Sequence, residues 1–375
     1  MDELNFRILD ALASSLGNNT SISSLKERVK ERSGKATYKN IYEKTQELAR
    51  NKILNLEIAG KASLVSLNLE NPATFDLLSE MEFAKKRKFL EKNPEMQAFL
   101  FAMESTFSRG FYFIESISIM RPARNAKLNK AEFLFLLREP LLTETEKQWD
   151  SKEEGEKAIQ NEIELIYSTM QLLQKRHNLK ADFLVLRENE FFELLKEQGK
   201  NALKEMLSDK TAFYSPQAFW LSIRRAMDQG ITVKAESEEF KPAKASEKEL
   251  FYNLSRFGYT EFGEKLQSSE NIAIESIAMA ILLQGDARRK EAIPVIISKA
   301  FDNKAGRKPN YRLLAFMCAR YGKLPELLGL LEAFNKIKPL KETEKAIKLI
   351  KKSGIEGKKV DLNALKEKMR LYNVI

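Results

Sequence analysis

The first seventy residues change from a helical to a strand-like hydrophobic period. Up to residue 52, apolar residues recur every three or four positions, which predicts helices over 1–16, around 25–29 and over 37–52. From residue 54 onward, apolar and polar residues alternate on both sides of Ala59-Gly60-Lys61-Ala62, which predicts two strands and a tight turn. The expected inward residues are Leu4, Ile8, Leu12, Leu16, Leu25, Val29, Ile41, Thr45, Leu48, Leu54, Leu56, Ile58, Val65, Leu67 and Leu69.

The middle of the chain, 95–230, alternates between the two periods and is predicted to be an α/β segment. It follows a connector helix within 71–94. The expected helices are 96–107, 153–176, 189–196, 202–207 and 216–227, and the expected strands are 111–120, 132–139, 180–187 and 212–214.

The rest of the chain has no strand-like period. Residues 231–247 are rich in Lys, Glu, Ala and Ser and are predicted to be a linker. In 248–375 we expect only helices, over 249–257, 260–267, 271–284, 287–300, 311–321, 324–334, 340–353 and 362–371. The predicted fold class is therefore α+β and mostly α, with domains at 1–70, 95–230 and 248–375.

Composition excludes several kinds of protein. The single Cys318 and single His177 argue against a disulfide framework, a conventional zinc site and a His-based catalytic triad. No apolar run reaches 18 residues and the N-terminus lacks a basic signal region, so we expect a cytoplasmic protein without a membrane partner. Neither a P-loop nor a dinucleotide-binding glycine pattern occurs, and no cofactor is expected.

The positive charge gathers at one end of the chain. The formal net charge is +10, yet residues 286–375 alone hold 22 Lys and Arg against 10 Asp and Glu. Such an excess favours a polyanionic or acidic partner, and ordinary solubility is the alternative. Within it, the loop 303–312 carries Lys304, Arg307, Lys308 and Arg312 beside Tyr311, a combination that can grip a phosphate backbone and stack a base. A solvated loop between helices is the alternative.

The order helix, helix, strand, turn, strand in 1–70 resembles the winged helix-turn-helix module. The resemblance implies that helix 37–52 enters a major groove and that the hairpin lies along the DNA backbone. The nucleic-acid-binding residues it implies are Lys35, Tyr38, Lys39, Tyr42, Lys44, Gln46 and Lys61. Double-stranded DNA is the first expected partner, RNA the second, and a homodimer is expected. Modules of this kind also dock on proteins.

The layout of 95–230 resembles the nucleotidyltransferase-like domains that archaeal proteins carry behind a winged helix. That family uses a Gly-Ser turn to hold the triphosphate and three strand carboxylates to hold two Mg²⁺. Here Met120-Arg121-Pro122-Ala123 replaces the turn and Lys130-Ala131-Glu132 replaces the carboxylate pair, so only Glu132 and Asp182 match. This pattern predicts an inactive domain without metal.

Three functions remain open at this point. The first is a winged-helix transcriptional regulator, and the second is an RNA- or ribosome-associated factor that binds through its basic C-terminal region. The third is a nucleotidyltransferase with an atypical metal site at Glu132 and Asp182.

Overall fold

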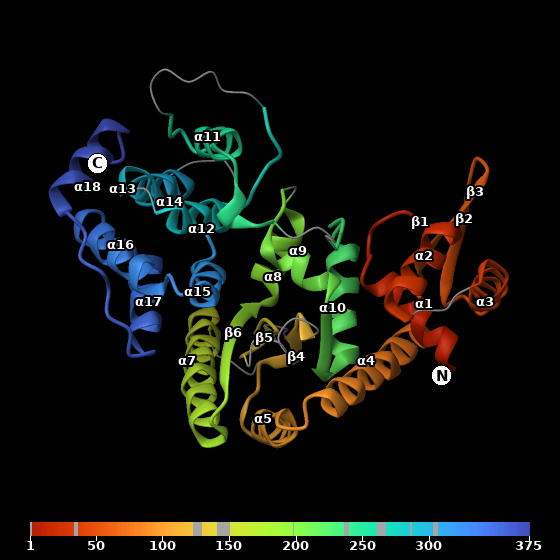
Figure 1. Ribbon diagram of the computed structural model, residues 1–375. Coiled ribbons are helices and arrows are strands. Elements are labelled where there is room, and N and C mark those ends of the chain that lie inside the picture. Colours follow the sequence, from red (N-terminus) through yellow and green to blue (C-terminus); the bar gives the residue numbers. More distant parts are fainter. Residues whose placement is uncertain are drawn as a thin grey trace. The chain divides into compact units, whose positions relative to one another are not determined.

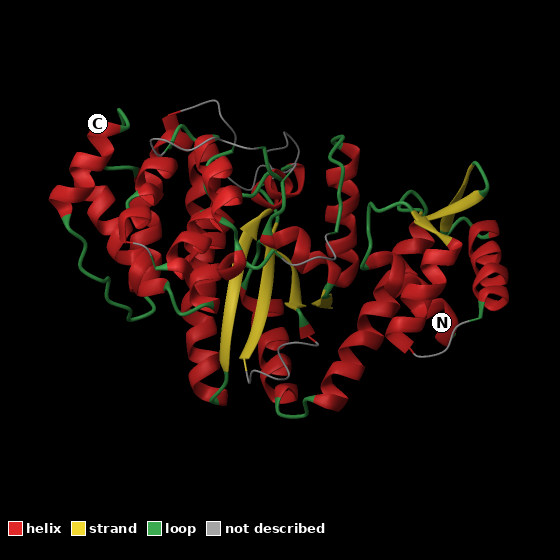
Figure 2. Ribbon diagram, turned by 45° about the horizontal axis from the view of Figure 1, so that its top comes forward, coloured by secondary structure: helices red, strands yellow, loops and turns green. Residues whose placement is uncertain are grey.

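The computed structural model is a mixed α+β protein with mostly helices and two small sheets (Figure 1, Figure 2). It describes residues 2–33, 37–122, 130–140, 151–197, 199–235, 240–260, 268–285, 287–302 and 307–375. The chain forms two compact units. Unit 1 comprises Met1–Ile163, Leu172–Lys196 and Leu203–Glu238, and unit 2 comprises Glu164–Gln171, Glu197–Ala202 and Glu239–Ile375.

Unit 1 begins with three helices and a three-stranded antiparallel sheet. These are α1 (Glu3–Ala13), β1 (Thr20–Ser21), α2 (Ile22–Ser33), α3 (Tyr38–Arg50), β2 (Leu54–Ala59) and β3 (Ala62–Leu67), with the strand order β1-β3-β2. The Asp2 and Thr37 side chains cap α1 and α3 by accepting backbone N–H bonds. Ile8, Leu25 and Ile41 are fully buried where the three helices meet.

The hairpin turn lies where the alternation predicted it. Ala59 pairs with Ala62, and Gly60 has φ of +62°, a conformation that glycine adopts without steric cost. The expected inward position of Ile58 is wrong, because its side chain is 82 % exposed. The hairpin tip extends past the three helices, so the alternation continues there without an opposing layer to bury it (Figure 1). The two-residue strand β1 was not predicted, because two residues are too short to show a period.

The second sheet of unit 1 has the order β6-β5-β4-β7. Its strands are β4 (Ile114–Met120), β5 (Lys130–Leu137), β6 (Lys180–Arg187) and β7 (Lys210–Tyr214). β5 and β6 are parallel, which requires a long crossover, and the helix α7 (Lys152–His177) lies in it. The remaining helices near this sheet are α4 (Pro72–Lys92), α5 (Met96–Gly110), α8 (Glu188–Lys196), α9 (Ala202–Ser208) and α10 (Pro216–Asp228).

Aromatic side chains fix α5 against the sheet. Phe133 and Phe135 lie two residues apart on β5 and therefore point to the same face. Their rings contact those of Phe99 and Phe107 of α5, with centroid distances of 5.8 and 5.1 Å. All four rings are fully buried and belong to the core of unit 1.

Helix α4 does more than connect. Its Glu82 is fully buried and its Oε1 lies 2.6 Å from Nζ of Lys210 on β7, while its Oε2 accepts the backbone N–H of Ala212. The Lys210 ammonium also lies 4.0 Å from the ring centroid of Phe219. Burial lowers the pKa of Lys210 to about 8, although Glu82 opposes the shift.

Helix α4 carries a run of four basic residues, Lys85-Lys86-Arg87-Lys88, and only half of the run is exposed to solvent. Lys85 pairs with Asp10 of α1 at 3.3 Å, and Lys86 pairs with Glu104 of α5. Only Arg87 and Lys88 are exposed. The two shielded lysines have carboxylates opposite them on neighbouring helices, which the local sequence does not reveal.

The expected linker is partly a packed segment. Val233 and Ala235 are buried, and the Ala235 N–H donates to the Leu16 carbonyl at 2.8 Å. A Cβ on Gly17, whose φ is +74°, would lie 1.9 Å from the Val233 carbonyl oxygen. The backbone at Gly17 therefore has to approach this segment closely, and only glycine allows that.

In unit 2, every regular element among the described residues from 240 to 375 is a helix. The elements are η1 (Pro242–Lys244), α11 (Glu247–Ser255), α12 (Ile274–Gln284), α13 (Ala287–Lys290), α14 (Ala292–Asp302), α15 (Tyr311–Arg320), α16 (Leu324–Ile337), α17 (Lys341–Lys351) and α18 (Leu362–Leu371). The single helix expected over 287–300 is interrupted at Glu291, and Pro294 lies in the first turn of α14, where proline is tolerated. Most of the helix expected over 260–267 lies outside the described residues. Among the described helices, none combines the length and apolar character that crossing a bilayer requires.

Candidate functional site

Helix α3 has one buried face and one exposed face. Ile41, Thr45 and Leu48 point into the three-helix core. Beside this buried stripe, Tyr38 and Tyr42 are exposed one turn apart, and their rings stack with centroids 6.1 Å apart. Lys39 lies beside them with its side chain in solvent. We call Tyr38, Lys39 and Tyr42 the α3 face.

Two other residues predicted on this helix are less available. The Lys44 side chain is 17 % exposed, and its Nζ lies 2.8 Å from Asp2 and 2.9 Å from Glu47. Hydrogen bonds to these carboxylates raise the pKa of Lys44. The sequence predicted that Lys44 points outward and contacts a phosphate. In the structure its ammonium is held by Asp2 and Glu47 instead. Gln46 is half-buried.

The hairpin supplies a second exposed group. Lys61 lies in its turn in solvent, and Ile58 is exposed just before it. The hairpin follows α3 directly in sequence and projects beyond the helices in both views (Figure 1, Figure 2). The remaining predicted residue of this region, Lys35, lies outside the described residues.

The charge of this region is modestly positive. Residues 38–67 contain five basic and three acidic side chains. The Lys39 ammonium is 3.9 Å from Glu43, and both side chains are more than half exposed, so this pair contributes little to stability and can be displaced by another anion. A polyanion that binds here would therefore meet few accessible cations, because Lys44 is already held by Asp2 and Glu47.

The central sheet brings together the two carboxylates that the sequence singled out. Glu132 of β5 and Asp182 of β6 are directly opposite each other in the parallel register. Each has a cation of its own chain: Nε of Arg121 lies 3.6 Å from Glu132 Oε2, and Nζ of Lys130 lies 2.5 Å from Asp182 Oδ2. Burial raises the pKa of Asp182 and Lys130 opposes the shift.

Arg121 reaches Glu132 through an unusual backbone. Its φ is +50°, in the left-handed region that non-glycine residues seldom adopt. Its N–H donates to the Asp209 carbonyl at 2.6 Å, which helps to hold that conformation. Arg121 stands where the resemblance would place a phosphate-binding Gly-Ser turn. The next residues, 123–129, lie outside the described residues.

This donor set does not fit a two-magnesium centre. Such a centre needs at least three carboxylates converging on two cations. Among the described residues no three or more His, Cys, Asp or Glu side chains cluster so as to hold a metal. Arg121 and Lys130 neutralise Glu132 and Asp182 without one. The sequence identified both carboxylates and the lysine, and the pairing of Arg121 with Glu132 required the fold.

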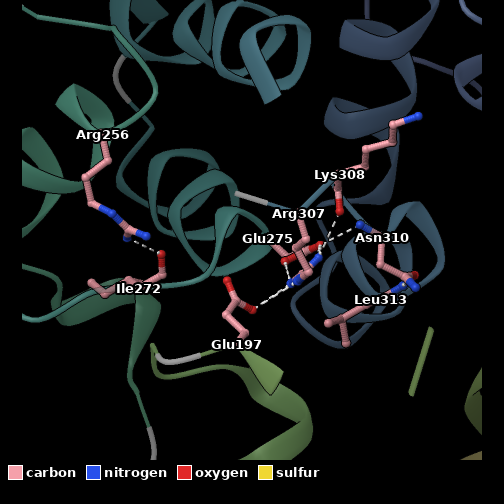
Figure 3. Close-up of polar contacts among 8 residues, drawn as sticks. All are labelled: Glu197, Arg256, Ile272, Glu275, Arg307, Lys308, Asn310 and Leu313. Atoms are coloured by element: carbon pink, nitrogen blue, oxygen red, sulfur yellow. Dashed lines mark hydrogen bonds and ion pairs between the residues drawn. The ribbon is translucent and has the colours of Figure 1, made fainter. Parts of the chain in front are cut away.

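In the described part of the basic loop of unit 2, residues 307–312, the side chains are less exposed than the sequence predicted (Figure 3). The Arg307 side chain is 11 % exposed, and its guanidinium makes two 2.6 Å bonds to the Glu275 carboxylate and one of 2.9 Å to Glu197. Although burial opposes it, these carboxylates raise the pKa of Arg307. The sequence predicted that Arg307 contacts nucleic acid from an exposed loop. The structure instead buries its guanidinium between two carboxylates of the same unit.

The other members of that loop do not form one site. Tyr311 is buried, with its hydroxyl 2.6 Å from that of Thr343, so it cannot stack a base. Lys308 is exposed and points away from the Arg307 cluster (Figure 3). Arg312 is half-exposed, and Lys304 lies outside the described residues.

One exposed group near the α3 face was missed by the sequence. Ile58 is the second residue before Gly60, and the strand β2 is exposed from Glu57 to its end at Ala59. Comparison of the chain with protein-family models, with curated proteins and with solved structures gave no significant match. The interpretation of its function therefore depends on the geometry of these sites.

Proposed function

We propose that the protein is a nucleic-acid-binding regulator that contacts double-stranded DNA through residues 1–70, used as a winged helix-turn-helix module. The observation that carries the proposal is the α3 face: a helix anchored by Ile41 and Leu48 presents Tyr38, Lys39 and Tyr42 to solvent and leads straight into a projecting hairpin.

The chemistry of these groups suits a duplex. A helix of this diameter fits the major groove, where Lys39 can reach a phosphate and the tyrosine hydroxyls can bond phosphates or base edges. Lys61 in the hairpin turn can contact the backbone of a neighbouring segment. Because few cations take part, we expect moderate affinity that decreases as salt rises.

A charge-reversal experiment tests the proposal. We expect Lys39→Glu combined with Lys61→Glu to weaken binding of a mixed-sequence DNA duplex at least about tenfold, because two phosphate contacts become repulsive. Fluorescence anisotropy at low salt measures this. The control is Lys248→Glu, which reverses the charge of another exposed lysine, in the first turn of α11. Unchanged affinity in the double variant would remove the α3 face from the binding site.

We also propose that the central sheet is a nucleotidyltransferase-like domain without catalytic activity. The supporting observation is that Glu132 and Asp182 each pair with an internal cation, Arg121 or Lys130. Metal binding would require displacing the partly buried Lys130 and the largely buried Arg121, which costs their ion pairs.

The enzyme alternative has its own assay. The full chain is incubated with labelled nucleoside triphosphate, Mg²⁺ and RNA or protein acceptors. We expect no transfer above the level of the Asp182→Ala variant. Transfer by the wild type that Asp182→Ala abolishes would establish an atypical active site instead.

A further inference from the structure

The solvent face of α4 carries an exposed aromatic side chain between opposite charges. Phe83 is 47 % exposed, with Glu80 one turn before it and Arg87 one turn after it, both exposed. At 100° per residue, positions 80, 83, 87 and 91 lie within a sector of roughly 80°. We call Glu80, Phe83, Arg87 and Glu91 the α4 face.

Two hollows adjoin this face within unit 1. The first, of about 850 Å³, is lined by α1 and α4 and includes Phe6 and Phe83. The second, of about 480 Å³, is lined by α4 and α5 and includes Phe101, whose side chain is 72 % exposed. Both hollows share Lys86 and Leu90. Single exposed apolar residues are ordinary, but two phenylalanines beside adjoining hollows are typical of an interaction surface.

The charged residues of the α4 face are complementary to those of a second copy of this chain. The first hollow is lined by four acidic and three basic residues, which are Asp2, Glu3, Glu80, Glu91, Lys86, Arg87 and Lys88. Neither a polyanion nor a polycation is complementary to such a mixture of charges. In an isologous contact, residue i of one copy meets residue j of the other copy, and residue j meets residue i, so an ion pair needs an acid and a base at equal distances on either side of the axis. Glu80 and Arg87 meet that condition about a centre beside Phe83.

We propose that the α4 face is a self-association surface, on which two copies of this chain cross their α4 helices antiparallel at Phe83. Glu80 of each copy then lies opposite Arg87 of the other, which gives two equivalent ion pairs around a phenylalanine contact. The proposal stands on this surface alone and does not depend on what residues 1–70 bind.

The like charges at the ends of the face are compatible with this crossing. An antiparallel arrangement centred beside Phe83 places Asp76 of one copy toward Glu91 of the other, roughly 11 Å along the helix from the crossing point. Packed helices cross at an angle, so their axes have diverged at that distance. Glu80 and Arg87 lie only about 5 Å from the crossing, where the axes are closest.

Sedimentation equilibrium of the full chain tests the proposal, from roughly 1 to 100 µM protein. We expect a dimer whose dissociation constant rises about tenfold with Glu80→Arg and about tenfold with Arg87→Glu, since each change creates two like-charge contacts. The double variant Glu80→Arg/Arg87→Glu restores the ion pairs with their signs exchanged and should return within about threefold of the wild type.

Further variants separate the aromatic contact from misfolding. Phe83→Ser removes the exposed ring and should leave a monomer at all these concentrations, with an unchanged far-UV circular dichroism spectrum. Lys248→Glu, on α11, should not change the dimer. A wild type that is monomeric at about 100 µM would overturn the proposal. A double variant that dissociates as much as the two single variants together would also overturn it.

Discussion

Two segments of this chain combine basic residues with tyrosine, and the fold uses them in opposite ways. In α3, Lys39 lies in solvent beside Tyr38 and Tyr42. In the loop before α15, Arg307 is shielded by Glu275 and Glu197, and Tyr311 is buried. A basic side chain next to an aromatic residue is therefore available to a ligand only where no buried carboxylate faces it. That condition depends on residues far away in the sequence.

The largest expected effect comes from removing Arg307, the buried basic residue of the two segments. Arg307→Met removes the cation from Glu275, whose side chain is fully buried, and should lower the free energy of unfolding by about 3–5 kcal/mol. Urea unfolding of the full chain measures it. The control is Lys308→Met at the exposed neighbouring position, expected within about 0.5 kcal/mol of the wild type. A loss below about 1 kcal/mol for Arg307→Met would contradict the structural role.

A second buried cation gives a pH-dependent effect. The pKa of Lys210 is about 8 in the folded chain, below its ordinary value, so between pH 8 and about 10 the unfolded chain holds this proton more tightly. The cost of burying the charge is fully present below pH 8 and is relieved as the pH rises. Relative to Lys210→Met/Glu82→Gln, the wild type should gain roughly 2 kcal/mol of unfolding free energy between pH 7 and pH 10.

Urea unfolding at the two pH values checks this prediction. The double variant is the proper reference because it replaces both charges of the pair and leaves no carboxylate without a cation. If the free energy of unfolding changes by the same amount in the wild type and in the double variant between pH 7 and pH 10, Lys210 does not titrate in this range.

Helix α3 itself contains an exposed lysine, Lys39, and a paired lysine, Lys44, whose contributions to DNA binding can be compared. Lys39→Ala should weaken DNA binding about threefold to tenfold, whereas Lys44→Ala should change it by less than about twofold. The Lys44 ammonium is already bound to Asp2 and Glu47 and has little charge to offer a phosphate. Anisotropy titrations at one salt concentration measure both. Equal losses would mean that Lys44 leaves its carboxylates when DNA binds.

The smallest effect is expected from the basic C-terminal region. Lys341, Lys345 and Lys348 are exposed on α17, and changing all three to Glu should alter affinity for duplex DNA by less than about twofold. The same triple variant tested on RNA addresses the alternative function. A loss of more than about tenfold on either nucleic acid would move the binding site to this region.

The elements themselves were largely predictable from the hydrophobic pattern. The expected strand over 180–187 has the bounds of β6, and the helix expected over 362–371 has those of α18. The expected pair of strands around Gly60 is the hairpin of β2 and β3. These predictions succeeded because a strand or an amphipathic helix needs only local periodicity and a boundary residue. The assignment of these elements to a winged helix and a nucleotidyltransferase-like domain stays a proposal.

The sequence by itself determined which segments become helices and strands, and it identified Glu132 and Asp182 as the candidate carboxylates. Only the tertiary structure decided which charges remain available. It placed Lys130 on Asp182, Glu275 on Arg307 and Asp2 on Lys44, and it left Lys39 in solvent. The reason is physical: periodicity is a property of neighbouring residues, whereas the state of a charge depends on burial and on partners that folding brings from distant parts of the chain.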